Sequence, residues 1–219
     1  MSPSDDLLAD YALAQGLPWD DLAAERFARY ADLLEQFNAK MNLIGPMDRD
    51  AIVRTLLRDS AVAATCAPPR GSMLDVGSGA GLPGIPLAIL YPEVSATLVE
   101  PRGKRATFIK IAAKRLGLEH VTSVNARLEE VAPARYDYVV SKAFRPPLDW
   151  LETAAAWRSD DGVIVCMTRA SEREALDTRA AEFGLVPVGE APSPEPPPEG
   201  MAPRWALAYG PGPAQPSRA

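Results

Sequence analysis

The chain has 219 residues, 47% of them hydrophobic, and 23 basic against 29 acidic side chains give it a formal net charge of −6. This length suits one catalytic domain with a short extension, the acidic balance argues against a general nucleic-acid-binding protein, and no apolar run approaches the ~18 residues needed to cross a bilayer. The lack of a signal-peptide pattern, the two distant cysteines Cys66 and Cys166 and the single histidine His120 predict a cytoplasmic protein with reduced thiols and no metal site.

Residues 1–70 are predicted to form a helical extension. Apolar side chains recur at steps of three and four residues along three segments, 5–15, 20–40 and about 49–65. Asp20 and Asp48 stand where they can cap the second and third of these helices. The extension lacks a convincing core of its own, so we expect it to pack onto the main domain.

Residues 71–210 alternate between short apolar segments and helical ones. Strands are expected at 73–76, 95–99, 121–124, 136–140, 162–167, 184–189 and 204–209. Helices are expected from Ile85 and over about 102–116, 148–157 and 171–183, with a short turn at 127–131. This alternation predicts an α/β domain with a parallel sheet and helices on both faces.

The C-terminal part departs from this alternation. Its two last strands have no helix between them and are expected to pair as an antiparallel hairpin. Residues 191–203 and the tail 211–219 are rich in Pro, Gly, Ser and Ala. Such segments cannot bury a core, so we expect both to be mobile.

The stretch Leu74–Gly84 organises the main domain. An apolar strand leads into glycines at 77, 79, 81 and 84 and then into a helix. Glycines let the backbone turn tightly and approach a ligand, and the first helical amides face that ligand. Asp75 in this turn would repel a pyrophosphate, so a cationic or zwitterionic ligand suits it better than a dinucleotide. The pattern resembles motif I of class I S-adenosylmethionine-dependent methyltransferases, although a glycine turn alone leaves other α/β ligand sites open.

Glu100 follows the next predicted strand, one βαβ unit after Asp75. A carboxylate at this place accepts hydrogen bonds from ribose hydroxyls. The alternative is a carboxylate in solvent at the end of a strand. Dinucleotide sites and S-adenosylmethionine sites both use such a group, so Glu100 does not separate them.

Further segments narrow the resemblance to one family. They are Asn38–Leu43, Arg58–Ser60, the proline-rich run Gly81–Leu87, Gly103–Arg105 with Phe108, and Ser141–Phe144. Over about residues 22–210 the chain resembles the small-subunit ribosomal RNA methyltransferase G family, also called glucose-inhibited division protein B. The resemblance implies a class I methyltransferase fold, with a seven-stranded, mostly parallel sheet. It also implies methyl transfer from S-adenosylmethionine to N7 of a guanine in 16S rRNA, with the 16S rRNA or the 30S subunit as partner.

The resemblance also implies roles for individual residues. The cofactor would be held by Asp75, Gly77, Gly79, Gly81, Leu82 and Glu100, with Gly77 and Leu82 beside its methionine and ribose portion. Leu128 and Glu129 would frame the adenine. Lys142 stands where the family usually has an arginine that contacts cofactor or substrate, and is the catalytic candidate.

The chemistry of the implied reaction fits the residues present. N7 of guanine carries a free lone pair, so attack on a sulfonium methyl needs no deprotonation, and positioning and water exclusion supply most of the rate. The sequence accordingly lacks the Asp/Asn-Pro-Pro-Tyr motif of enzymes that act on exocyclic amines. Cys166 is interpreted as a packed core thiol. Phe144 could stack on a flipped guanine or pack under the next helix, and both interpretations stay open.

Several departures from the family pattern bear on the substrate. Thr55-Leu56 replaces an Arg-His pair, Arg169-Ala170 replaces Lys-Gly, and Lys142 loses the planar fork of an arginine. They leave open another RNA or a small molecule as substrate, or a catalytically impaired ribosome-binding paralogue. Residues 100–115 carry six basic side chains against Glu100, a charge of 6 − 1 = +5 that suits either a solvated helix face or phosphate contacts. A monomer is expected.

Overall fold

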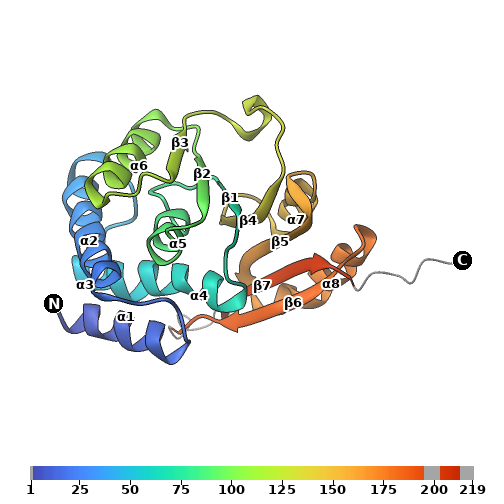
Figure 1. Cartoon of the computed structure of the whole chain (residues 1–219), viewed down its shortest axis with the longest axis horizontal. Helices are drawn as coiled ribbons and strands as arrows, with labels where there is room; N and C mark the ends of the chain where they lie inside the picture. The colour runs from blue at the N-terminus through green and yellow to red at the C-terminus, as the bar shows by residue number, and fades with distance from the viewer. Residues whose placement is uncertain (1, 195–202, 213–219) are drawn as a thin grey trace, which may run out of the picture.

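The computed structural model describes residues 2–194 and 203–212, and its centre is one seven-stranded sheet (Figure 1). The strands are β1 Ser72–Val76, β2 Ser95–Val99, β3 Val121–Val124, β4 Tyr136–Lys142, β5 Arg158–Arg169, β6 Leu185–Pro192 and β7 Arg204–Pro211. Their order is β3-β2-β1-β4-β5-β7-β6. The first five run parallel, and β7 is antiparallel to both β5 and β6. The predicted α/β class, the mostly parallel sheet and the antiparallel final hairpin are confirmed.

The helices cover the sheet in two layers. They are α1 Pro3–Ala14, α2 Asp21–Met41, α3 Arg49–Ala51, α4 Arg58–Cys66, α5 Gly84–Leu90, α6 Gly103–Leu116, α7 Pro147–Ala155 and α8 Arg173–Glu182. A π-helical segment, η1 Ile52–Leu57, joins α3 to α4, and short 3-10 turns lie at η2 Leu128–Glu130 and η3 Ala170–Glu172. One core contains side chains of α1, α2, α4, α5 and α6, and the other those of α7 and α8. Parallel strands buried on both faces explain why the sequence shows apolar runs instead of alternation.

The N-terminal helices pack against the main domain through aromatic and hydroxyl side chains. Tyr30 and Phe37 of α2 contact Phe108 of α6, with ring centroids 6.5 Å and 5.4 Å apart. Tyr11 of α1 hydrogen-bonds Thr65 of α4 at 3.2 Å. Among the residues that the structure describes, no helix is long and apolar enough to cross a membrane.

Several elements differ from the sequence prediction in type or in boundary. The helix expected over 49–65 contains the π-helical turns of η1, which apolar periodicity over six residues cannot distinguish from α-helix. Strand β4 continues to Lys142 and β5 covers Arg158–Arg169, because the two strands keep pairing beyond their apolar centres, as at Lys142 and Met167. Ala191 and Pro192, expected in a mobile loop, pair with β7 instead, and so does Pro211 with β6. The rest of the expected mobile regions, 195–202 and 213–219, lies outside the described residues.

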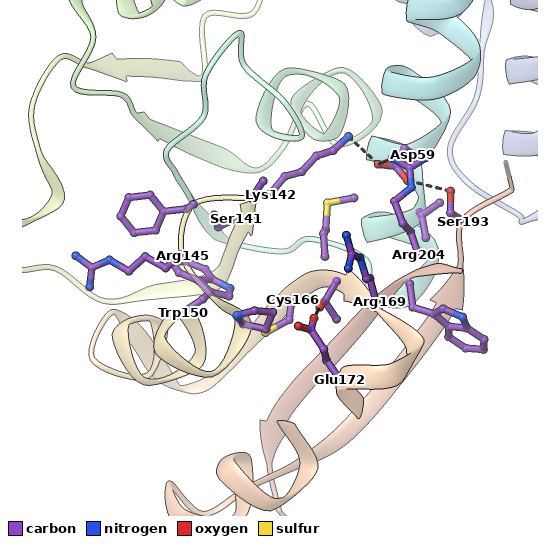
Figure 2. A pocket seen from close by; sticks show the side chains of 17 residues that line it. Asp59, Ser141, Lys142, Arg145, Trp150, Cys166, Arg169, Glu172, Ser193 and Arg204 are labelled. Carbon is purple, nitrogen blue, oxygen red and sulfur yellow. Dashed lines mark hydrogen bonds and ion pairs between the residues drawn. The ribbon is translucent and has the colours of Figure 1, made fainter. Parts of the chain in front are cut away.

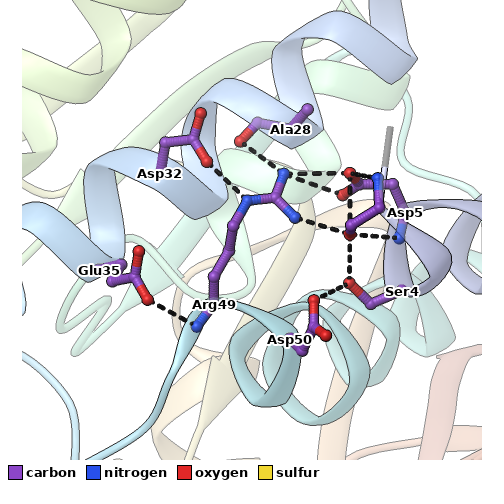
Figure 3. A network of polar contacts seen from close by, with 8 residues as sticks. Ser4, Asp5, Ala28, Asp32, Glu35, Arg49 and Asp50 are labelled. Carbon is purple, nitrogen blue, oxygen red and sulfur yellow. Dashed lines mark hydrogen bonds and ion pairs between the residues drawn. The ribbon is translucent and has the colours of Figure 1, made fainter.

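Arg49 ties the first helices together (Figure 3). Its guanidinium donates to both carboxylate oxygens of Asp5 at 3.1 Å, to Asp32 at 2.6 Å and to the Ser2 hydroxyl at 2.9 Å. Burial alone would raise the pKa of Asp5, but the Ser2 amide and the Arg49 guanidinium outweigh it and hold that pKa below its usual value. One cation therefore links the start of α1, the middle of α2 and the start of α3.

We expect the Arg49→Ala substitution to lower the free energy of unfolding by about 2 kcal/mol, because the charge-assisted bonds to the partly buried Asp5 and to the exposed Asp32 are lost. Chemical denaturation measures the change. The exposed Arg54, six residues beyond Asp48 on η1, offers the control, and Arg54→Ala should cost less than about 0.5 kcal/mol. Equal effects of the two substitutions would contradict the linking role of Arg49.

Candidate functional site

The glycine turn follows β1 at the edge where parallel strands end. Gly77, Gly79 and Gly81 have φ of 69°, 58° and 89°, in the left-handed region that favours glycine. A Cβ at Gly77 would lie 2.7 Å from the Phe144 ring, and one at Gly81 would lie 2.6 Å from Ile85. At Gly79 the nearest atom would be Arg105 Nη1 at 3.8 Å, so this part of the turn is open. The turn thus has a packed beginning and end and an accessible middle.

Asp75 lies beneath the turn and is fully buried. Its Oδ2 accepts a hydrogen bond from the Gly84 amide at 2.9 Å, while its Oδ1 has no hydrogen-bond partner. Burial raises the pKa of Asp75 to about 7, and the nearby charge of Glu100 adds to the effect. The structure therefore places this predicted ligand residue where it joins the turn to the start of α5.

Glu100 lies beside the open middle of the turn. Its Oε2 accepts from the Gly79 amide at 2.9 Å and its Oε1 from the Arg102 amide at 2.8 Å. A carboxylate offers about four lone-pair sites, so two remain for a ligand after these bonds. The register of β1 and β2, with Val76 opposite Val99, brings Gly79 and Glu100, both predicted cofactor residues, next to each other.

Two of the other predicted cofactor residues lie on η2, and Leu82 lies in the turn itself. Leu128 is buried in the core beneath α7, and Glu129 is exposed and pairs with Arg145 at 2.7 Å. Leu82 is buried, with 8% of its surface exposed. The basic side chains of α6 begin next to this region, because Arg105 is the group nearest to the open face of Gly79.

Tyr30 is a residue of this region that sequence reasoning missed. It belongs to α2, is fully buried, and donates from its hydroxyl to the Ala80 carbonyl at 2.6 Å. Burial, with the charge of Asp75, raises its pKa well above the usual value. A tyrosine on the apolar stripe of a helix signals such a contact, since a buried hydroxyl needs a partner, but the partner cannot be read from the sequence. The N-terminal extension thus supports the glycine turn directly.

A pocket of about 290 Å³ lies next to the turn, at the ends of β4 and β5 (Figure 2). Its walls carry the aromatic side chains Phe144, Trp150 and Trp205, the cations Lys142, Arg145, Arg169 and Arg204, and the acids Asp59 and Glu172. Four cations against two acids give this pocket a positive balance on an acidic protein. None of the predicted cofactor residues except Lys142 lines it.

Phe144 connects the pocket to the glycine turn. Its ring lines the pocket, rests against Gly77, meets Trp150 edge-on with centroids 6.1 Å apart and lies 5.0 Å from the Arg145 guanidinium. Ala143 before it has φ of 58°, an uncommon backbone for a residue with a Cβ. Such strain persists where the surroundings enforce it and is frequent at functional sites.

Lys142 projects from the end of β4 to the far wall of the pocket. Its Nζ lies 2.6 Å from Asp59 Oδ2, and Arg204 lies 3.6 Å from the same oxygen. Asp59 Oδ1 accepts from the Ser193 hydroxyl at 2.9 Å. Asp59 lies in the Arg58–Ser60 motif, but the sequence assigns no role to Ser193 or Arg204. A β-hairpin more than 130 residues away supplies these two partners.

Cys166 lies in the core, away from solvent. Cys166 is 1% exposed, and burial raises the pKa of its thiol, which fits the packed thiol expected from the sequence. Within residues 2–194 and 203–212, no cluster of three or more His, Cys, Asp and Glu side chains is arranged to hold a metal ion.

We expect Tyr30→Phe to cost about 1 kcal/mol of stability and to weaken binding at the glycine turn, because the Ala80 carbonyl loses its buried donor. Calorimetric titration with S-adenosylhomocysteine and thermal denaturation check both effects. Tyr91→Phe, at the opposite end of α5, is the matched control. Unchanged ligand affinity in the Tyr30 variant would remove this residue from the site.

The stability of the wild-type protein should fall relative to Asp75→Asn as the pH rises from about 4 to about 7. The pKa of Asp75 rises from 3.8 to about 7 on folding, so the folded state holds the proton more tightly and loses this advantage as the pH increases through that range. Asparagine keeps an acceptor for Gly84 and carries no charge. Denaturant titrations of both proteins across this range provide the measurement, and parallel stability profiles would contradict the buried-carboxylate account.

Known proteins similar in sequence to this chain are methyltransferases. The family model for rRNA small subunit methyltransferase G matches residues 23–186. A protein named ribosomal RNA small subunit methyltransferase G from Chlorobaculum tepidum is 34% identical, covering 84% of this chain and 90% of the relative. Its namesake from Chromohalobacter salexigens is 38% identical, covering 76% of this chain and 80% of the relative.

Solved structures share the fold at lower identity. The 1,6-didemethyltoxoflavin-N1-methyltransferase of Burkholderia thailandensis superposes with a TM-score of 0.58 at 18% identity, over 83% of this chain and 88% of that one. M. jannaschii TYW2 in complex with AdoMet gives 0.55 at 16% identity, over 70% and 72% of the two chains. These likenesses confirm the class I methyltransferase fold. The match of the family model to three-quarters of the chain, together with the relatives that cover most of it, shows that the chain belongs to the rRNA small subunit methyltransferase G family.

Proposed function

We propose that this protein transfers a methyl group from S-adenosylmethionine to N7 of a guanine in 16S rRNA. Its family makes it an S-adenosylmethionine-dependent methyltransferase of small-subunit rRNA. What we propose beyond the family is the target base, guanine, the methylated atom, N7, and the roles of individual residues. The observation that carries them is the contact of Phe144 with Gly77, which joins a pocket of base size to the cofactor turn.

The residues of the turn fit the cofactor. Glu100 retains free lone pairs beside Gly79, where the backbone is open, so it can accept bonds from ribose hydroxyls. Gly77 and Leu82 would lie beside the methionine and ribose portion, Leu128 and Glu129 beside the adenine. Asp75 would act from beneath, by holding the Gly84 amide at the end of the turn. When bound, S-adenosylmethionine supplies an electrophilic methyl group on a sulfonium.

The pocket suits an acceptor that needs no deprotonation. Neither acid in its lining is placed as a free general base, because Asp59 is held as a carboxylate by the Lys142 cation and Glu172 is bonded to the Thr168 hydroxyl. The lone pair of guanine N7 is free at neutral pH, so alignment and exclusion of water supply the catalysis. The aromatic ring of Phe144 offers a stacking surface for a base taken out of its helix. Lys142, the catalytic candidate, would donate a hydrogen bond to the base.

Lys142, which stands where the family usually has an arginine, keeps the positive charge of that position. The ammonium group reaches Asp59 and lines the pocket, so the structure offers no sign that this position has lost its partner. This contact supports an active enzyme. The methyl-transfer experiment below distinguishes it from an impaired paralogue or a small-molecule enzyme. We further propose that the protein acts in the cytoplasm, where its substrate would be; the monomeric state stays a prediction.

The proposed activity predicts incorporation of labelled methyl into 30S subunits from a strain that lacks this gene. Mass spectrometry of the RNA should find 7-methylguanosine in 16S rRNA and no label in subunits that already carry the modification. Cofactor binding without any transfer to 30S subunits or naked 16S rRNA would overturn the proposal.

Glu100→Ala should weaken S-adenosylmethionine binding at least about tenfold, because two charge-assisted bonds to a ligand are worth more than about 1.4 kcal/mol. Calorimetric titration measures the affinity. Glu93→Ala removes an exposed carboxylate before β2, at the opposite edge of the sheet, and should leave it unchanged. Equal affinity of the two variants would remove Glu100 from the cofactor site.

A further inference from the structure

Asp59 is a buried carboxylate at the wall of the pocket. It lies near the start of α4, and its side chain is only 5% exposed. Burying a charge is costly unless cations and hydrogen bonds compensate it. Lys142, Arg204 and Ser193 do so from three other segments of the chain. The fold therefore maintains a compensated carboxylate at one place in the pocket wall.

The contacts of Asp59 leave acceptor capacity for a ligand. Oδ1 carries one hydrogen bond, from Ser193, and Oδ2 faces Lys142 at 2.6 Å. Four lone-pair sites on a carboxylate are not exhausted by these partners.

A second, independent feature points to a polar ligand in the same pocket. Ser141, the residue before Lys142 on β4, is 3% exposed and lines the pocket, and its hydroxyl has no hydrogen-bond partner. Buried hydroxyls in folded proteins are nearly always bonded, to protein, water or ligand. The pocket thus presents a hydroxyl whose partner is not supplied by the described protein.

The polar groups in the pocket wall are complementary, in their order, to the donors and acceptors along one edge of guanine. From Asp59 to Lys142 the wall presents two carboxylate acceptors and then an ammonium donor, which Figure 2 shows side by side. Guanine presents the N2 amino donor, the N1–H donor and then the O6 acceptor along its edge, with N7 next to O6. Beyond Lys142 the wall continues to Phe144, which touches Gly77 of the cofactor turn. A guanine that bonds Asp59 through N1 and N2, and Lys142 through O6, has its N7 on the side of that turn.

Adenine does not match this order. It presents the N1 acceptor where the carboxylate needs a donor, and the N6 amino donor where the ammonium needs an acceptor. A site built around buried hydrogen-bonding groups rejects such an analogue strongly, because its own groups are left unpaired.

We propose that Asp59 determines the specificity of the enzyme for guanine, by accepting hydrogen bonds from N1–H and the N2 amino group while Lys142 donates to O6. The choice of guanine as the base rests on the proposed function. The geometry of the carboxylate, the ammonium and the unpartnered Ser141 hydroxyl is independent of it.

The test is direct binding of mononucleotides to the full-length protein saturated with S-adenosylhomocysteine. Guanosine, inosine and adenosine monophosphates are titrated by calorimetry; inosine keeps N1–H and O6 but lacks the N2 amino group. Wild-type protein should bind the guanine nucleotide about tenfold more tightly than the inosine one, as expected for one hydrogen bond to a charged group, and the adenine nucleotide most weakly. In Asp59→Asn the advantage of guanine over inosine should fall to about twofold or less.

Two further variants separate recognition from a structural role. Ser193→Ala removes the hydroxyl bond to Asp59 while leaving Arg204 and Lys142 beside the carboxylate, and should keep the order of nucleotide affinities. Glu119→Gln removes an exposed charge between α6 and β3 and matches the change in net charge. Thermal denaturation reports whether Asp59→Asn remains folded; a structural role alone would lower the melting temperature without changing the order of affinities.

The outcomes distinguish this proposal from the function on which it rests. Methyl transfer by the wild type to N7 of 16S rRNA, with the same nucleotide order in wild type and Asp59→Asn, would overturn the specificity role and leave the function standing. Binding of none of the nucleotides up to their solubility limit would also overturn it. A guanine preference that depends on Asp59, without transfer to rRNA, would support base recognition and refute the rRNA substrate.

Discussion

The buried hydrogen bond from the Gly84 amide to the Asp75 carboxylate holds the glycine turn on which both parts of the site depend. It anchors the start of α5 beneath the turn, so Gly77, Gly79 and Gly81 can adopt left-handed backbone above it. The turn in turn places the Gly79 amide on Glu100 at the end of β2. Burying a carboxylate costs free energy. Here the buried carboxylate fixes the geometry of the loop through its bond with Gly84.

Two elements from outside the sheet complete this arrangement. Tyr30 of α2 bonds the Ala80 carbonyl from one side, so the N-terminal helices stabilise the cofactor turn as well as covering a face of the sheet. Phe144 rests on Gly77 from the other side and forms part of the adjoining pocket. The absence of a side chain at Gly77 is what permits that contact, since a Cβ there would overlap the ring. Cofactor turn and pocket are therefore joined through one glycine and one aromatic ring.

The pocket itself is assembled from segments distant in sequence. Asp59 comes from α4, Lys142 from β4, and Ser193 and Arg204 from the two sides of the final hairpin. The antiparallel insertion of β7 between β5 and β6 is what brings Arg204 to Asp59. The positive balance of its rim contrasts with the net charge of the chain, so total charge is a poor guide to the substrate. Local charge at the ends of β4 and β5 and at the start of β7 is the relevant quantity for binding RNA phosphates.

The sequence by itself determined the alternation of strands and helices, the glycine turn and the position of Glu100 at the end of the next strand, because these depend on local periodicity and on parallel strands ending at one edge. Its motifs also pointed to the family whose model matches residues 23–186. Only the tertiary structure decided that Asp75 faces inward, that Tyr30 reaches the turn, and that Asp59 meets Lys142, Ser193 and Arg204. The physical reason is that burial of a carboxylate or hydroxyl is set by partners from remote segments, and such pairings leave no periodic signal in the residues around either partner.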